Sequence, residues 1–217
     1  MRDLDDDITT EVRADEQALQ KEPLNGERLG HIADLVYEVG MLRQTPRTGW
    51  AYLGTNSENV AEHSFRVAVL GYILARLAGV EPDSVVRLCL FHDLHEARSG
   101  DFNYVYHRYN QTKPHAALAD ALLGTGFLAE IVSYFDEFSG SETQAALLAN
   151  DADQLDLIAN LRVELHKGNQ FARDWLDSAL LRLKTEEGRQ LARALLEADP
   201  NNWWYGEVAK SFWVHHK

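Results

Sequence analysis

Apolar residues recur at helical spacing along most of the chain. Residues 27–43 carry apolar side chains every three or four positions, and similar patterns run through 58–78 and from Pro82 to about Ala97. Intervals of three and four place side chains on one face of an α-helix. Further segments of this kind cover 115–124, 127–138, 142–167, 170–183 and 186–198, with one more short helix expected near the end. Because no alternating run is long enough for a strand, the pattern predicts an all-α fold.

Breaks in this pattern mark the expected loops. Residues 45–57 are rich in Pro, Gly, Thr and Asn, which is typical of a loop. Ser57 can cap the helix over 58–78, and Gly79 can close it. Residues 101–115 mix aromatic and polar residues irregularly, so we expect a long loop there.

The chain divides into an acidic start and one large domain. Residues 1–24 are acidic and are expected to form a loosely attached arm, while 25–217 are expected to form a single helical domain. A length of 217 residues suits one domain with a short tail. The single cysteine, Cys89, excludes an internal disulfide and a multi-cysteine zinc site, and its apolar surroundings predict a buried thiol.

Charge and hydropathy limit the partners that we expect. The net charge is −13, from 21 Lys and Arg against 34 Asp and Glu. Such an acidic surface disfavours duplex nucleic acid, which is held by clustered cations. No stretch approaches the ~20 apolar residues that cross a bilayer, and the first residues do not resemble a signal peptide. We therefore expect a cytoplasmic protein with no membrane partner.

Four polar residues stand where the helical pattern expects apolar ones. His63, His92 and Asp153 each continue the apolar stripe of their own helix, and Asp93 follows His92 directly. Adjacent helical residues project about 100° apart, so one ion could reach both members of the His-Asp pair. A buried carboxylate is costly unless it is paired or bound to metal. Imidazole nitrogen and carboxylate oxygen together favour one divalent transition metal, namely Mn, Co, Zn, Fe or Ni.

Simpler interpretations of these residues exist. A single inward histidine is more often a satisfied core residue than a ligand. Asp153 has Asp151 and Asp156 as neighbours, so an exposed acidic face is an alternative. The joint order favours the metal: a His, then His-Asp 29 residues later, then an Asp 60 residues after that.

Four sequence blocks occur in order along about residues 28–175. They are RTGW at 47–50, ENVAEHS at 58–64, HDLHE at 92–96 with Gly100-Asp101, and Asp153 followed by GNQF at 168–171. Together they resemble the HD superfamily of metal-dependent phosphohydrolases, and most closely its HD-domain 5′-deoxynucleotidase branch. The resemblance implies an HD-domain helical bundle over 25–217, with a metal site in the bundle core.

The resemblance also implies roles for individual residues. The implied metal ligands are His63, His92, Asp93 and Asp153, the implied catalytic residues are Glu96 and Asp101, and the implied substrate-binding residues are Arg47 and Trp50. Glu96 would manage a proton near the metal, and the guanidinium of Arg47 suits phosphate. Trp50 would lie against the sugar or base, and Asp101 would hold a sugar hydroxyl or steer the water.

The expected activity is removal of phosphate from (deoxy)nucleoside 5′-monophosphates, with a nucleotide as the small-molecule partner and a homodimer as the assembly. The segment after Asp101 departs from the family pattern and contains His107 and His115. A diiron HD oxygenase that uses one of these histidines is therefore an alternative, as are a non-catalytic HD module for ligand sensing or dimerisation and a metal-free helical scaffold. The aromatic residues of 203–213 are either core or an interface.

Overall fold

The computed structural model describes residues 21, 23–55 and 58–215, and these residues contain helices but no strand. The expectation of an all-α fold is confirmed for this part of the chain. The expected acidic arm, residues 1–24, lies mostly outside the described residues. In chain order the elements are α2 (Gly26–Val39), η1 (Gly40–Arg43), η2 (Thr48–Leu53), α3 (Val60–Ala78), α4 (Pro82–Phe91), α5 (Glu96–Ser99), α6 (Tyr104–His107), α7 (Pro114–Leu122), α8 (Leu128–Gly140), α9 (Gln144–His166), α10 (Ala172–Leu180), α11 (Glu186–Glu197), α12 (Asn202–Tyr205) and α13 (Glu207–His215).

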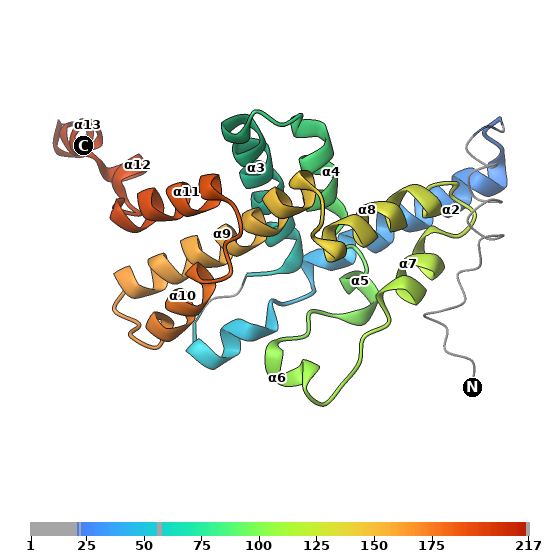
Figure 1. Cartoon of the computed structure of the whole chain (residues 1–217), viewed down its shortest axis with the longest axis horizontal. Coiled ribbons are helices and arrows are strands. Elements are labelled where there is room, and N and C mark those ends of the chain that lie inside the picture. Colours follow the sequence, from blue (N-terminus) through green and yellow to red (C-terminus); the bar gives the residue numbers. More distant parts are fainter. Residues whose placement is uncertain (1–20, 22, 56–57, 216–217) are drawn as a thin grey trace.

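The long helix α9 runs through the middle of the bundle (Figure 1) and packs against α3, α4, α8, α10 and α11. Its inward residues, such as Leu148, Leu155 and Leu161, are fully buried in the larger apolar cluster. A smaller cluster joins α7 and α8 with Leu42 and Val60. The core therefore surrounds α9, and polar side chains on this helix can meet those of α3 and α4.

Helix ends explain where α3 begins and stops. Asn59 is its N-cap and accepts a hydrogen bond from the Glu62 backbone N–H at 3.0 Å. The cap is thus Asn59, and Ser57, which we expected in this role, lies outside the described residues. Gly79 closes the helix with a φ of 68°, a left-handed conformation that glycine adopts without strain.

The helix expected to run from Pro82 to Ala97 is interrupted, so that prediction was wrong beyond Phe91. Residues 92–95 form turns in which Leu94 N–H donates to Phe91 C=O and Glu96 N–H donates to Asp93 C=O. The His92 ring donates from Nδ1 to the Cys89 carbonyl at 2.7 Å. That carbonyl would accept the next N–H of a continuing helix, so the side chain competes with the backbone.

The expected loop over residues 101–115 needs correction. Residues 101–115 were expected to be a loop, but they contain the short helix α6, which Asn103 caps by accepting from the N–H groups of Val105 and Tyr106.

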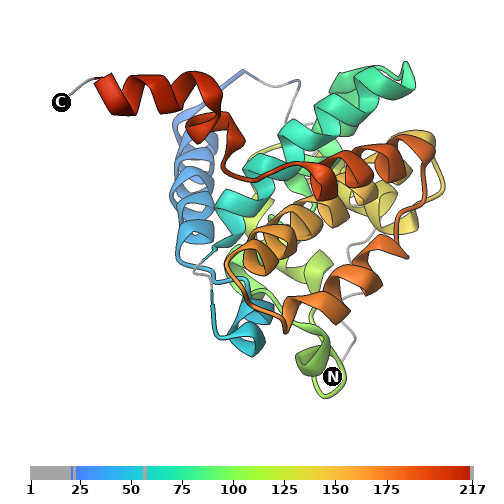
Figure 2. The ribbon, with the colours of Figure 1, turned by 90° about the vertical axis from the view of Figure 1, so that its left-hand side faces the viewer.

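The aromatic residues of α12 and α13 are exposed, with 86% of Trp203 accessible, so they are not core residues. Figures 1 and 2 show these helices beyond the body of the bundle. No helix in the described part of the chain is long and apolar enough to cross a membrane.

Candidate metal centre and substrate cavity

The structure brings the four expected metal-binding side chains together from three parts of the chain. His63 lies on α3, His92 and Asp93 lie in the turn after α4, and Asp153 lies on α9. The Nε2 atom of His63 lies 3.3 Å from Nε2 of His92, 3.5 Å from Oδ2 of Asp93 and 3.2 Å from Oδ1 of Asp153. The His92 Nε2 to Asp93 Oδ2 distance is 3.1 Å. We call these four residues the metal centre.

Both histidine rings are held by their other nitrogen. His63 Nδ1 lies 2.8 Å from Oδ2 of the buried Asp156, and His92 Nδ1 donates to the Cys89 carbonyl. A ring whose Nδ1 carries the proton presents a lone pair at Nε2. Two such lone pairs and an Asp153 oxygen then lie close together, which is unfavourable unless a cation lies there, and Asp93 contacts both histidines from beside this group. Partners of this kind usually orient metal-binding histidines.

The separations within the metal centre suit a divalent ion. Ligand atoms at about 2.0–2.2 Å from one ion, the usual range for N and O donors, lie roughly 3–3.5 Å from one another. The measured contacts of 3.1–3.5 Å fall in this range. His63, His92 and Asp153 form a group with the spacing of a metal site. The donor set and its geometry therefore fit the cation that the sequence predicts.

Electrostatics in the metal centre are dominated by burial and by close opposite charges. In the site without a metal, burial would raise the pKa of Asp153, but a hydrogen bond from the protonated His63 ring and the positive charges nearby lower it to about 2. Burial also opposes ionisation of Asp93, yet His92, Arg47 and His63 hold its pKa well below the usual range. Both carboxylates are therefore ionised at neutral pH and available to a cation.

Glu96 lies beside the metal centre and differs from its neighbours. It is buried, and its Oε2 atom has no hydrogen-bond partner in the structure. Ligand atoms of Asp93, His95 and Glu96 lie within 4.8 Å of one another. Burial, followed by the negative charges of Asp93 and Asp101, raises the pKa of Glu96 to about 9. An unsatisfied, readily protonated carboxyl is suited to exchange a proton with a bound molecule.

Arg47 approaches the metal centre from the loop before α3. Its Nη1 atom donates to Asp93 Oδ2 at 3.3 Å and to Asp101 Oδ1 at 3.1 Å. The other Asp101 oxygen accepts from the Thr48 backbone N–H at 2.6 Å and from the Thr48 hydroxyl at 2.9 Å. Asn103 donates to the same hydroxyl. The Asp101 carboxylate is thus engaged in holding the Arg47 loop.

Trp50 is 4% exposed, and its ring N–H donates to Glu58 Oε2 at 2.9 Å. The ring still borders a cavity, together with Trp175 on α10, whose ring centroid lies 6.4 Å away. Glu58 in turn accepts from Arg66, and Arg66 also donates to Asp156 behind His63. Trp50 is therefore both a packed residue and part of the wall of this cavity.

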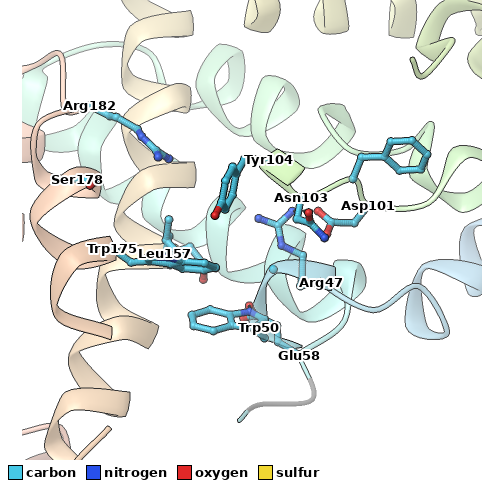
Figure 3. A pocket seen from close by; sticks show the side chains of 13 residues that line it. Arg47, Trp50, Glu58, Asp101, Asn103, Tyr104, Leu157, Trp175, Ser178 and Arg182 are labelled. Carbon is cyan, nitrogen blue, oxygen red and sulfur yellow. Dashed lines mark hydrogen bonds and ion pairs between the residues drawn. The ribbon is translucent and has the colours of Figure 1, made fainter. Parts of the chain in front are cut away.

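The cavity has a volume of about 400 Å³ and opens beside Arg47 and Asp101. Figure 3 shows Arg47 and Arg182 on opposite sides of it, with Tyr104 between them. Sequence reasoning missed several of its lining residues. We call four of them the cavity rim, namely Tyr104, Trp175, Ser178 and Arg182. The last three are spaced by three and four, so a helical face on 172–182 was the signal that could have identified them.

The two histidines of the alternative diiron site lie elsewhere. His107 packs against Phe102, with ring centroids 5.9 Å apart. His115 Nε2 lies 2.6 Å from Asp136 Oδ1, and its ring packs edge-on against Phe135. Among the described residues, neither histidine joins a group with the spacing of a metal site.

Comparisons with known proteins give consistent results. A family model described as HD domain matches residues 39–194, more than half of the chain. The 5′-deoxynucleotidase HDDC2 of Xenopus laevis is 29% identical over 167 residues, which cover 73% of this chain and 83% of that protein. A conserved hypothetical protein from Pyrococcus furiosus is 29% identical, with a TM-score of 0.65 over 76% of this chain and 99% of that chain. A predicted metal-dependent phosphohydrolase from Magnetospirillum magnetotacticum MS-1 is 26% identical, with a TM-score of 0.62 over 81% of this chain and 94% of that chain.

Proposed function

Because the chain belongs to the HD domain family, we propose that it is a metal-dependent phosphohydrolase that releases phosphate from deoxynucleoside 5′-monophosphates. The observation that carries this proposal is the position of Arg47, which lies against the metal centre at the edge of a cavity with aromatic walls. The Xenopus laevis relative is named as a 5′-deoxynucleotidase, which supports the same substrate class.

The cavity suits a nucleoside in size and lining. A volume of about 400 Å³ is within the usual range for small-molecule sites, which combine apolar walls with a few polar groups. Trp50 and Trp175 offer ring surfaces to a sugar or base. A monophosphate needs no long cradle of cations, which agrees with the small number of arginines along the cavity.

We assign the metal to His63, His92, Asp93 and Asp153, and we expect Mn, Co, Zn, Fe or Ni. When bound, a divalent ion lowers the pKa of a water molecule and polarises a phosphoryl oxygen. Arg47 binds and orients the phosphate, while Asp101 and Thr48 hold the Arg47 loop in place. Glu96 in its protonated form donates to the leaving 5′-oxygen. Asp101 therefore acts through Arg47 in this proposal, and not on a sugar hydroxyl.

The first test is a phosphate-release assay on dAMP, AMP and a generic phosphodiester with the same metal. We expect release from dAMP and slower release from AMP, because a site shaped for deoxyribose would offer the extra 2′-hydroxyl neither space nor a partner. Such rejection is modest, on the order of 10²-fold or less. Arg47→Ala should raise KM and lower kcat, because phosphate is bound in the ground and transition states. Preference for the diester, or no release from any monophosphate, would overturn the substrate assignment.

The rival functions make different predictions for metal content. A diiron oxygenase would hold two irons per chain, whereas the proposed hydrolase holds one ion in the metal centre. A non-catalytic module has no use for the proton-carrying Glu96, which is present here beside the metal centre. Elemental analysis of purified protein separates the oxygenase, the hydrolase and a metal-free scaffold, which hold two, one and no ions, and the phosphate-release assay separates the hydrolase from a non-catalytic module.

We also propose a cytoplasmic homodimer. The outward face of α3 presents five exposed apolar residues at helical spacing, namely Phe65, Val69, Tyr72, Ile73 and Leu77. A contiguous apolar face of this kind is typical of an interface, and a second copy would cover it symmetrically. The buried single thiol and the nucleotide substrate favour the cytoplasm. The molar mass in solution tests the dimer: a monomer at micromolar concentration would contradict it.

A further inference from the structure

A second arginine, Arg182, borders the cavity from the turn that follows α10. It is exposed, and within the described part of the chain no carboxylate forms an ion pair with it. Its Nη1 atom donates to Gln154 Oε1 over 3.4 Å, a long hydrogen bond to a neutral amide. Arg47 and Arg182 are the two cationic residues among those that line the cavity. Unlike Arg47, Arg182 keeps its full positive charge available to a ligand.

The position of Arg182 relates directly to the metal centre. Gln154 accepts from Arg182, and its amide nitrogen donates to Asp153 Oδ2 at 2.9 Å. Two hydrogen bonds through one side chain therefore separate Arg182 from a proposed metal ligand. Arg182 and Arg47 reach the cavity from opposite sides (Figure 3), and the two hydrogen bonds through Gln154 connect Arg182 to Asp153.

The charges around the metal centre indicate why a second cation would help to bind phosphate. Asp93, Asp101 and Asp153 bring three negative charges to the centre, leaving Glu96 aside. Arg47 and one divalent ion bring three positive charges, so the occupied centre has no net positive charge. A phosphate monoester carries up to two negative charges near neutral pH. Stable binding of that group in a partly buried site requires further positive charge.

We propose that Arg182 is a second phosphate-binding residue, which faces Arg47 across the cavity and donates to an oxygen of the substrate phosphate. This inference rests on the proposed function for its substrate, but phosphate binding can be measured without turnover. Since the phosphate group is common to all nucleotides, Arg182 contributes equally to every base. The three remaining rim residues, Tyr104, Trp175 and Ser178, are left to contact the nucleoside.

The test compares three variants of the metal-loaded protein. Arg182→Gln removes the charge, Arg182→Lys keeps it, and Arg173→Gln removes an equivalent exposed charge from α10 outside the cavity. Calorimetry with inorganic phosphate should show about tenfold weaker binding for Arg182→Gln, as expected for loss of a charge-assisted hydrogen bond. Arg182→Lys should recover part of this loss, and Arg173→Gln should stay within about twofold of the wild type.

Kinetics give the second measurement. Arg182→Gln should lower kcat/KM by a similar factor for dAMP, dGMP, dCMP and dTMP, with unchanged metal content. Unchanged phosphate binding would overturn the proposal, as would a loss confined to some bases, which would make Arg182 a reader of the base. Loss of metal would assign it a role through Gln154 and Asp153 instead. If the wild type hydrolyses no nucleotide, the proposed function fails, while calorimetry with phosphate still decides the role of Arg182.

Discussion

The metal centre and the cavity rim are built in contrasting ways. In the metal centre both histidines have one nitrogen committed to a fixed partner, and the rings are almost fully buried. At the rim, Arg182 is exposed and held by one long hydrogen bond, and Tyr104 is 64% exposed. Buried and fully bonded groups hold a geometry, whereas exposed groups adapt to a ligand. Under the proposed function, the rigid centre would hold the reacting groups, and the more exposed rim would contact the rest of the substrate.

The largest effect is expected in the metal centre. Asp93→Ala should abolish both metal binding and phosphate release, because a methyl group cannot replace a charged ligand and also frees Arg47 from one of its partners. Elemental analysis and phosphate release measure the two losses. Asp83→Ala, which removes an exposed carboxylate from α4, the helix before Asp93, is the control and should behave like the wild type. Full activity in a metal-stripped Asp93→Ala sample would place the chemistry elsewhere.

A smaller but still large effect is expected from Glu96, which lies beside the metal centre. Glu96→Ala should leave metal content nearly normal and reduce turnover by about 10²–10⁴, the usual contribution of general acid–base help. Glu96→Gln, which keeps the side-chain volume, should give the same loss if proton transfer is the cause. Should metal disappear together with activity, Glu96 is a ligand or supports one, and its assigned role is wrong.

The smallest effect is expected at the rim. Trp175→Leu keeps apolar bulk against the core but removes a ring surface from the cavity. We expect KM to rise by about tenfold or less with little change in kcat, because stacking contributes about 1 kcal/mol and is made before the reaction. Phe171→Ala removes an exposed aromatic residue just before α10 and serves as the control. A fall in kcat at constant KM would show that the rim also shapes the reaction.

The sequence was informative wherever a residue violated a periodic pattern. His63, His92 and Asp153 stood in apolar stripes, and the structure brings all three side chains together with Asp93. The interruption after Phe91 was not predictable in the same way. It depends on the His92 side chain taking a backbone carbonyl, a choice that periodicity does not encode.

The cavity was harder to foresee because its walls come from distant segments. Trp175 and Arg182 lie far along the chain from the Arg47 loop, and their meeting depends on how α10 packs on α9. Asp101 was expected near the substrate, and it both lines the cavity and is bonded to Thr48 and Arg47. Sequence blocks identified this residue, but only tertiary contacts distinguish a group that touches a ligand from one that holds its neighbour.

One chain of hydrogen bonds links the wall of the cavity to the metal centre. Trp50 donates to Glu58, Arg66 joins Glu58 to Asp156, and Asp156 holds the His63 ring. Because these hydrogen bonds connect the Trp50 ring to the His63 ring, we expect a substitution at Trp50 to change metal affinity as well as the shape of the cavity. To change the substrate preference of this protein, it would therefore be better to alter α10, which contributes no residue to this chain of hydrogen bonds.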